Sequence, residues 1–228
     1  MSKGYVCALL AGAAVALGAS SAGAVQYGGV EFPQGAVSFA DQVVSYQPGL
    51  QGASPTAPFQ GAGNALGIPD YSGSNTCAAT CSFVSLGVGG ALVLRFTDNV
   101  LTGSNNSNDD LWIFEIGPDV EDTTIDVSTD GMTWLSVGSV SGSTRGVDID
   151  AFGYDSSSAF SYVRLIDVAN EGATSGTTVG ADIDAVGAIS TRAVNPVPEP
   201  STWALMLLGF FGLGSAVRTA RRRRLSAA

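Results

Sequence analysis

Residues 91–97, ALVLRFT, indicate the fold class of this chain. Leu92, Leu94 and Phe96 alternate with Val93 and Arg95, which is the period of two that a β-strand requires. None of the similar runs that follow keeps the spacing of an amphipathic helix over three turns. These runs are LWIFEIG (111–117), TIDVS (124–128), TWLSVGSV (133–140), SYVRLIDV (161–168) and DIDAVGAIS (182–190). Short strands divided by Gly, Ser, Asn and Asp predict an all-β protein with an antiparallel β-sandwich or barrel.

The segments between these runs carry turn and loop signals. Asp130-Gly131 predicts a tight hairpin, because glycine adopts positive φ without strain. Residues 98–110, DNVLTGSNNSNDD, predict a long polar loop that contains no strand. Residues 45–75 are rich in proline and glycine, and we expect them to wrap one end of the sandwich irregularly.

Cysteine usage fits an exported protein. Cys7 lies in the first apolar stretch, which leaves Cys77 and Cys81 as a pair in the middle of the chain. In an oxidising compartment such a pair predicts a structural disulfide. The alternative, redox catalysis, is less favoured because the spacing is C-x3-C rather than C-x-x-C and no basic group adjoins it.

The N-terminus has the pattern of a secretory signal peptide. Lys3 precedes the apolar run YVCALLAGAAVALGA, and small residues close it at Ala22-Gly23-Ala24. A basic start, a short apolar helix and an A-x-A site are what the secretion translocon and signal peptidase require. We therefore expect residues 1–24 to be a signal helix that is cleaved after Ala24.

The C-terminus combines an apolar run with a basic tail. Residues 202–217 contain no charge but number fewer than the roughly 20 that span a bilayer comfortably. Beyond them lie Arg218, Arg221, Arg222, Arg223 and Arg224. The positive-inside rule would hold these arginines on the cytoplasmic face of the inner membrane. The alternative, a nucleic-acid-binding arm, is less favoured because an apolar run directly precedes the arginines.

These terminal residues resemble a known sorting signal. Val197, Pro198, Glu199 and Pro200, followed by the apolar helix and the arginine-rich tail, are similar to the PEP-CTERM signal of bacterial surface proteins. The resemblance implies retention in the inner membrane until an exosortase-type protease cuts near the motif. It therefore implies export, C-terminal anchoring and then release to the cell surface or exterior. The expected division is a signal peptide at 1–24, an exported domain at 25–195 and a sorting signal at 196–228.

The middle of the chain carries a second resemblance. The segments NALGIPDY, FVSLGVGGALVLRFTDN, DLWIFEIG, IDVSTDGMTWLSVG, YVRLIDV and GADIDAVGAI, in that order, are similar to a family of secreted bacterial surface domains. The resemblance covers about residues 63–190 and implies a jelly-roll, galactose-binding-like sandwich. It bears on fold more than on function, because that fold hosts many ligands.

Charge and composition exclude several functions. Residues 25–200 hold four arginines against twenty acidic residues, which leaves a net charge of −16. So little positive charge argues against nucleic acid as a partner. The chain has no histidine, which excludes Ser-His-Asp catalysis and histidine-bound zinc.

Carboxylates remain as the possible catalytic groups. A glycosidase needs only two of them, but an acidic surface carries many without any catalytic role. Glu115 stands out, because alternation places it with Leu111 and Ile113 on one face of its strand. There it needs a partner, and Arg95 or Arg164 is expected to supply one. The other candidates are Glu121, Asp122, Asp126 and Glu171.

The sequence requires no cofactor, and structural calcium is the candidate that its aspartates offer. Asp182 and Asp184 lie two apart in a predicted strand and should point to the same side. Asp70, Asp109 and Asp110 lie at strand ends, where carbonyl oxygens are also available as ligands. The resembled jelly-roll domains often hold calcium at one end. The alternative is that these aspartates cap turns.

Aromatic residues are candidates for a sugar-stacking surface. Trp112 and Trp134 lie in apolar runs and are expected in the core, whereas Tyr71 and Tyr154 lie beside polar residues and are expected to be exposed. Tyr162 is a further candidate. The sequence thus predicts a non-catalytic surface or matrix protein that contacts exopolysaccharide. The alternatives are a two-carboxylate hydrolase and a membrane-anchored periplasmic protein.

Overall fold

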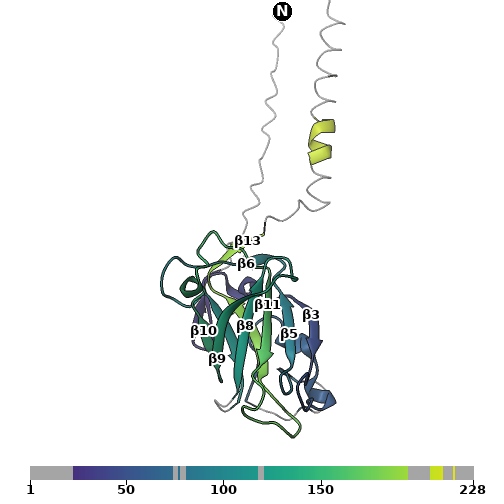
Figure 1. The fold of residues 1–228 in the computed structure, drawn as a ribbon. Coiled ribbons are helices and arrows are strands. Elements are labelled where there is room, and N and C mark those ends of the chain that lie inside the picture. Colours follow the sequence, from purple (N-terminus) through teal and green to yellow (C-terminus); the bar gives the residue numbers. More distant parts are fainter. Residues whose placement is uncertain are drawn as a thin grey trace, which may run out of the picture.

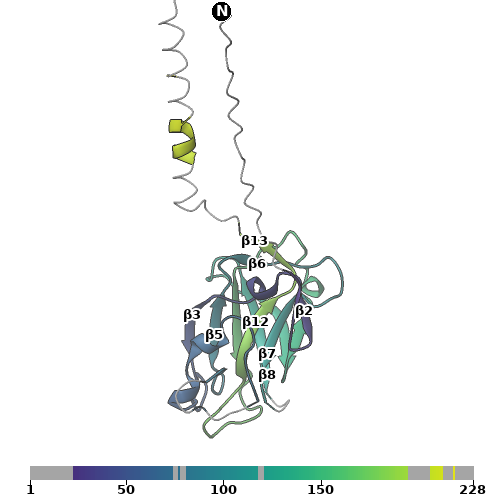
Figure 2. The ribbon, with the colours of Figure 1, turned by 180° about the vertical axis from the view of Figure 1, so that it is seen from behind.

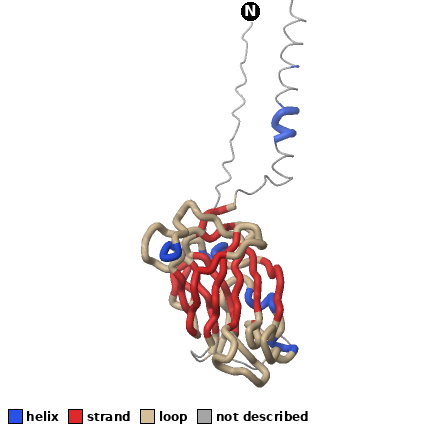
Figure 3. The backbone as a smooth tube through the Cα atoms, viewed as in Figure 1, coloured by secondary structure: helices blue, strands red, loops and turns tan. Residues whose placement is uncertain are grey.

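The computed structural model describes residues 23–73, 77, 81–117, 121–194, 206–212 and 218. Two antiparallel sheets stack against each other, as the sequence predicts (Figure 1). Figure 3 shows that strands make up the two layers, while short helices lie in their connections. The described residues between 23 and 194 therefore form a β-sandwich.

One sheet has five strands in the order β3-β5-β11-β8-β9, and the other has four in the order β10-β7-β12-β4. The first contains β3 (Gln42–Gln47), β5 (Ala91–Arg95), β11 (Tyr162–Asp167), β8 (Asp122–Ser128) and β9 (Leu135–Ser141). The second contains β10 (Arg145–Val147), β7 (Leu111–Glu115), β12 (Asp182–Ala188) and β4 (Val84–Ser85).

Two small two-stranded sheets and four 3-10 turns accompany the main sheets. One is a hairpin of β1 (Val25–Tyr27) and β2 (Val30–Phe32), and the other pairs β6 (Asn99–Leu101) with the distant β13 (Thr191–Ala193). The 3-10 turns are η1 (Gly35–Ser38), η2 (Ala57–Phe59), η3 (Ala62–Ala65) and η4 (Asp150–Phe152).

The main core lies between the two sheets. Leu92 and Leu94 of β5 are fully buried there with Val163 and Leu165 of β11. Ile113 of β7 reaches the same core from the opposite sheet. Because side chains alternate along a strand, the neighbours of these residues are turned to the outer face of each sheet.

The outer face of one sheet is covered by a hairpin, and that of the other sheet is not. Phe32 of β2 and Phe39 pack against Phe114 of β7 and Ala185 of β12, so the β1–β2 hairpin covers the outer face of the four-stranded sheet. Figure 2 shows β2 beside β12 and β7 in the view from behind. Among the described residues, no strand or helix lies over the outer face of the five-stranded sheet (Figure 1). That face is open to solvent.

The irregular segment and the disulfide lie where the sequence places them, with one difference. Cys77 and Cys81 form the predicted disulfide. Cys81 packs with Phe59, Phe83 and Ile116 in a small separate cluster. The difference is that residues 45–47, predicted to be irregular, belong to strand β3, which pairs with β5.

The segment 98–110 contains a strand, so the prediction of an uninterrupted loop is wrong. Asn99, Val100 and Leu101 are buried and form β6, which pairs with β13 near the end of the domain. Leu101 belongs to the main core. The sequence did not predict this strand because Val100 and Leu101 are followed by many polar residues.

The predicted hairpin at Asp130-Gly131 is confirmed, but its connection, residues 129–134, is longer than the tight turn expected. It joins β8 to β9, and Gly131 has the positive φ, +74°, that the turn requires. Asp130 Oδ1 accepts hydrogen bonds from the backbone N–H groups of Met132 and Thr133, each at 2.8 Å. The carboxylate therefore fixes the turn that presents residue 134.

Several predictions about the termini lie outside the described residues. These concern Ala22, Val197, Pro198, Glu199, Pro200 and Arg221 to Arg224. Ala24 is described and directly precedes β1, while Arg218 and residues 206–212 are helical. Within the part of the chain that is described, no helix has the length and apolar character needed to cross a bilayer.

Gly90 provides a test of how tightly the open sheet is joined to the loop before it. A Cβ at this position would overlap the carbonyl oxygen of Leu86, whereas a Cβ at Gly63 would meet nothing within 4 Å. We expect Gly90→Ala to lower the free energy of unfolding by about 1–3 kcal/mol, because backbone must move to admit the methyl group. Gly63→Ala should change it by less than about 0.5 kcal/mol. Urea unfolding of both variants measures the difference, and equal effects would contradict this account.

Candidate functional site

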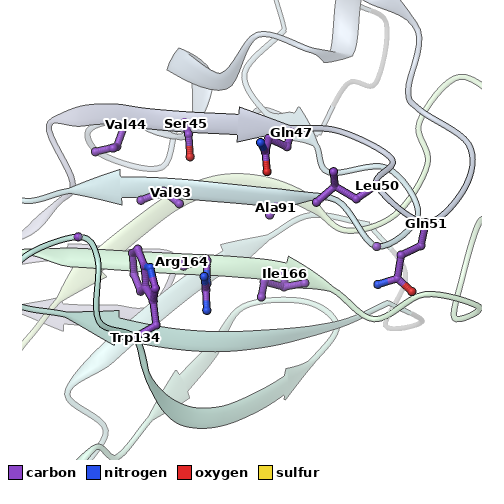
Figure 4. Close-up of a pocket in the computed structure, with 12 residues that line it drawn as sticks. Val44, Ser45, Gln47, Leu50, Gln51, Ala91, Val93, Trp134, Arg164 and Ile166 are labelled. Atoms are coloured by element: carbon purple, nitrogen blue, oxygen red, sulfur yellow. The ribbon is translucent and has the colours of Figure 1, made fainter.

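A groove of about 390 Å³ runs across the open outer face of the five-stranded sheet (Figure 4). Strands β3, β5 and β11 form its floor, and the segments after β3 and β8 form its ends. Its lining consists of Val44, Ser45, Gln47, Leu50, Gln51, Gly89, Ala91, Val93, Gly131, Trp134, Arg164 and Ile166. The groove is thus a surface channel with an apolar floor and a polar rim.

Strand alternation explains the character of the floor. Val93 and Ile166 point outward because their neighbours Leu92 and Leu165 point into the core. Polar side chains come from the edge strand β3, from the loop after it and from Arg164 of β11. Figure 4 shows Gln51 and Leu50 at one end of the groove, and Trp134 beside Arg164 at the other.

Arg164 is the best-fixed polar group in the groove. Its Nε and Nη2 donate to Asp126 Oδ2 at 2.9 and 2.5 Å. Its guanidinium carbon lies 4.5 Å from the centre of the Trp134 ring, in cation–π geometry. Among the described residues its other N–H groups have no acceptor. Arg164 is therefore oriented by two partners and still has donors free for a ligand.

A second arginine–aromatic pair lies on the same face. Arg95 of β5 lies 5.4 Å from the ring centre of Tyr162 of β11, and the two residues are partners in the strand register. Only four basic residues occur between positions 25 and 200. Two of them are thus placed beside aromatic rings on the open sheet face.

The aromatic residues lie differently from the sequence-based expectation. Trp134 is in the turn before β9 and is half-buried in the groove, so its assignment to a strand and to the core is wrong. Trp112 does pack against the cluster under the β1–β2 hairpin. Tyr154 stacks edge-on against Phe160 and Tyr71 against Phe83, so both are half-buried rather than exposed.

Glu115, the carboxylate that strand alternation singles out, is buried. It lies on the inner face of β7 with Leu111 and Ile113, as alternation predicts. It is only 5% exposed, and its Oε2 has no hydrogen-bond partner among the described residues. Burial raises its pKa to about 8. The expected partners Arg95 and Arg164 lie instead on the outer face of the other sheet.

Three further carboxylates accept hydrogen bonds from neighbouring strands and loops. Asp167 accepts the N–H groups of Gly89 and Ala181, each at 2.8 Å, and Glu121 accepts that of Ala173 at 3.0 Å. Asp182 accepts the hydroxyl of Ser85. Burial is the main cause that raises the pKa of Asp182 to about 7, with Glu121 and Asp167 adding to it. These groups therefore act as structural acceptors.

The aspartates predicted to bind calcium do not form one group. A register shift at Asp184 separates it from Asp182, so the two do not share a side as expected for a regular strand. Asp184 instead accepts the N–H groups of Asp70 and Tyr71 at 3.2 and 3.3 Å. Its carboxylate oxygens thus already have partners.

Glu115 and Asp184 both line a second pocket, of about 270 Å³. Burial raises the pKa of Asp184 to about 6, so both carboxyl groups hold protons more tightly than usual. This pocket therefore has two carboxyl groups in its lining, which the two-carboxylate alternative requires. Backbone amides hold Asp184, and backbone hydrogen bonds at residues 143 and 182 partly offset the effect of burial on the pKa of Glu115.

Asp110 lies elsewhere, in a group that the sequence revealed only in part. One carboxylate oxygen from each of Asp110, Asp148 and Asp150 lies within 4.8 Å of the others. Asp109 is nearby, and the charge of Asp148 contributes to the raised pKa of Asp109, after burial. Asp148 and Asp150 were missed, although the D-I-D triplet at 148–150 repeats the one at 182–184.

The buried acids predict a pH dependence of stability. A carboxyl whose pKa is raised on folding favours the folded state while it is protonated, and this contribution is lost as pH rises from its unfolded pKa toward its folded one. For Glu115 that window runs from 4.5 to about 8. We expect the melting temperature, measured with a chelator, to fall by several degrees across it, and Glu115→Gln to flatten part of the fall. The exposed Glu171→Gln is the control, and a flat wild-type profile would refute the prediction.

Comparisons with known proteins give few matches. No family model matches the chain, and no curated protein matches it. It is similar to the C-terminal domain of a chitobiase from Bacteroides fragilis, at 16% identity and a TM-score of 0.38, over 70% of this chain and 97% of that one. It is also similar to the CBM32 of AlyQ in complex with 4,5-unsaturated mannuronic acid, at 9% identity and a TM-score of 0.36. This match covers 69% of this chain and 98% of that one. Both TM-scores are too low for either likeness to decide the fold or the ligand of this chain.

Proposed function

We propose that the chain is an exported, non-catalytic module that binds exopolysaccharide or envelope glycans through the open face of its five-stranded sheet. The observation that carries this proposal is the Asp126–Arg164–Trp134 arrangement at the end of the groove. Its two contacts orient a cationic donor beside an indole before any ligand arrives. Pre-positioned polar groups on an apolar surface are typical of ligand sites.

The chemistry of the groove suits a sugar chain. A pyranose ring has an apolar C–H face and a polar rim of hydroxyl groups. Ile166 and the indole of Trp134 offer apolar surface, while Gln47, Gln51 and the free N–H groups of Arg164 offer hydrogen bonds. Because the groove crosses three strands, it fits a segment of polymer better than a single terminal sugar.

Export and sorting complete the proposal. The signal-like residues 1–24 support passage through the secretion translocon, and residues 196–228 support transient anchoring in the inner membrane and cutting by an exosortase-type protease. The acidic exported part does not favour nucleic acid as a partner. We place the processed protein at the cell surface or outside the cell.

The groove proposal predicts the effect of removing the indole. Trp134→Ala should weaken polysaccharide binding by about tenfold, which corresponds to a loss of about 1.4 kcal/mol. Arg164→Gln should weaken it as well, because the oriented donor is lost. Met132→Ala is the matched control, since this side chain belongs to the same turn and is 80% exposed. A glycan array identifies the ligand, and calorimetry with that glycan compares the variants.

The outcomes separate binding from catalysis. Unchanged affinity in Trp134→Ala, or no binding to any neutral or acidic glycan, would reject the groove as the site. Release of reducing ends from the bound polysaccharide, abolished in Glu115→Gln, would instead support a two-carboxylate hydrolase that uses the pocket of Glu115 and Asp184.

The sorting proposal has its own test. Intact-mass analysis of protein recovered from the cell surface should show that residues 1–24 and the tail with Arg221 to Arg224 are absent. If the tail is retained in every cell fraction, the chain is a permanently anchored periplasmic protein. Replacing Pro198, Glu199 and Pro200 with alanine should block removal of the tail while leaving removal of the signal peptide intact.

A further inference from the structure

Three aspartates converge from two connections that are far apart in the sequence. Asp110 ends the β6–β7 connection, while Asp148 and Asp150 begin the connection from β10 to β11. Pairing of Val147 in β10 with Leu111 in β7 brings these connections together. One carboxylate oxygen of each aspartate lies within 4.8 Å of the others.

This spacing matches the coordination of one calcium ion. Calcium binds oxygen ligands at about 2.3–2.6 Å, so two ligands of the same ion lie no more than about 5 Å apart. All three oxygen pairs meet that limit. Carboxylate oxygens are also the ligands that this hard cation prefers.

An independent observation points to a missing partner at the same place. Asp110 is 0% exposed, and its Oδ2 accepts the N–H of Ile149, the residue between Asp148 and Asp150, at 3.0 Å. This bond ties Asp110 to the segment that carries the other two carboxylates. The hydroxyls of Ser104 and Ser190 lie near enough to lower the pKa of Asp110, against the larger effect of burial, but neither makes a hydrogen bond of good geometry to its Oδ1, which has no partner among the described residues. A buried carboxylate oxygen without a donor is costly unless a cation accompanies it.

The surrounding backbone is built to hold the group in place. Asp150 accepts the backbone N–H groups of Ser104 and Asn105, at 2.7 and 3.1 Å to its Oδ2. A Cβ at Gly103 would lie 2.9 Å from each carboxylate oxygen of Asp150, so the chain approaches this side chain as closely as glycine allows. Asp148 Oδ1 accepts the N–H of Asp150 at 3.0 Å. Among the described residues, Asp148 Oδ2 has no donor, which leaves it available as a ligand.

We infer that Asp110, Asp148 and Asp150 form a calcium site that joins the β6–β7 and β10–β11 connections. This site differs from the one expected from the sequence, where Asp70, Asp109, Asp182 and Asp184 accompanied Asp110. Asp184 and Asp150 both accept backbone N–H groups, and what distinguishes the Asp110 group is that oxygens of three aspartates lie within 4.8 Å of one another.

Calcium would also act on the open sheet through η4. A Cβ at Gly138 of β9 would lie 2.9 Å from the ring of Phe152, which belongs to η4 together with Asp150. Binding therefore orders two connections and steadies a residue that packs on the edge strand of the groove sheet. The inference stands independently of whether the groove binds glycans.

The experiment uses the full-length chain in mild detergent, with calcium chloride as the titrant. Calorimetry measures calcium affinity, and thermal unfolding with calcium or chelator measures the accompanying stabilisation. The variants are Asp110→Asn, Asp148→Asn and Asp184→Asn. Asp148 is partly exposed, so its variant tests the site even if Asp110→Asn fails to fold. Asp184→Asn is the matched control at the alternative position.

We expect calcium to raise the melting temperature of the wild type and of Asp184→Asn alike. Asp148→Asn should lower calcium affinity by at least about tenfold, since a charged ligand is lost. Absence of binding heat and of a thermal shift in the wild type would overturn the inference. Loss of binding in Asp184→Asn with full binding in Asp148→Asn would overturn it too, and would assign calcium to the pocket of Glu115 and Asp184.

Discussion

Burial of one side of each strand between two stacked sheets is the constraint on which the rest of the structure depends. Leu92, Leu94 and Leu165 contribute fully buried side chains to this core. Since a strand has a period of two, their burial leaves Val93 and Ile166 no position except the outer face. The groove floor is therefore a consequence of the core, and a slip of one residue in register would remove both together.

The two outer faces differ because only one of them has a covering hairpin. Phe32 and Phe39 bury the outward side chains of the four-stranded sheet, and a Cβ at Gly187 would lie 2.7 and 2.8 Å from their rings. The five-stranded sheet carries charge on its corresponding face instead. Arg164 is partly desolvated there, and its ion pair with Asp126 and its stacking on Trp134 compensate for that. The open face is therefore a polar and aromatic surface that needs no further layer.

The sequence predicted most of the sandwich because its strands carry their own signal. The runs at 91–97, 111–117 and 161–168 contain β5, β7 and β11 within two residues at each end. Strand β6 was not predicted, because it has only three residues and their burial depends on pairing with β13, about ninety residues later. The prediction placed Trp134 in a strand because it began the apolar run inside a turn, which Asp130 fixes by hydrogen bonds. In both cases a tertiary or turn interaction overrode the local pattern.

The predicted acid sites show the same limit, since proximity of carboxylates depends on pairing between distant strands. Asp110 meets Asp148 and Asp150 only because β10 pairs with β7, and no spacing in the sequence encodes that contact. The D-I-D triplets at 148–150 and 182–184 are identical, yet a strand bulge at Asp184 separates the two carboxylates of the second triplet. Glu115 and Asp110 each have a buried oxygen without a partner. Glu115 meets this cost by keeping its proton, since its pKa is about 8. Asp110 lies within reach of two further carboxylates, where a divalent cation neutralises more charge than a single proton does.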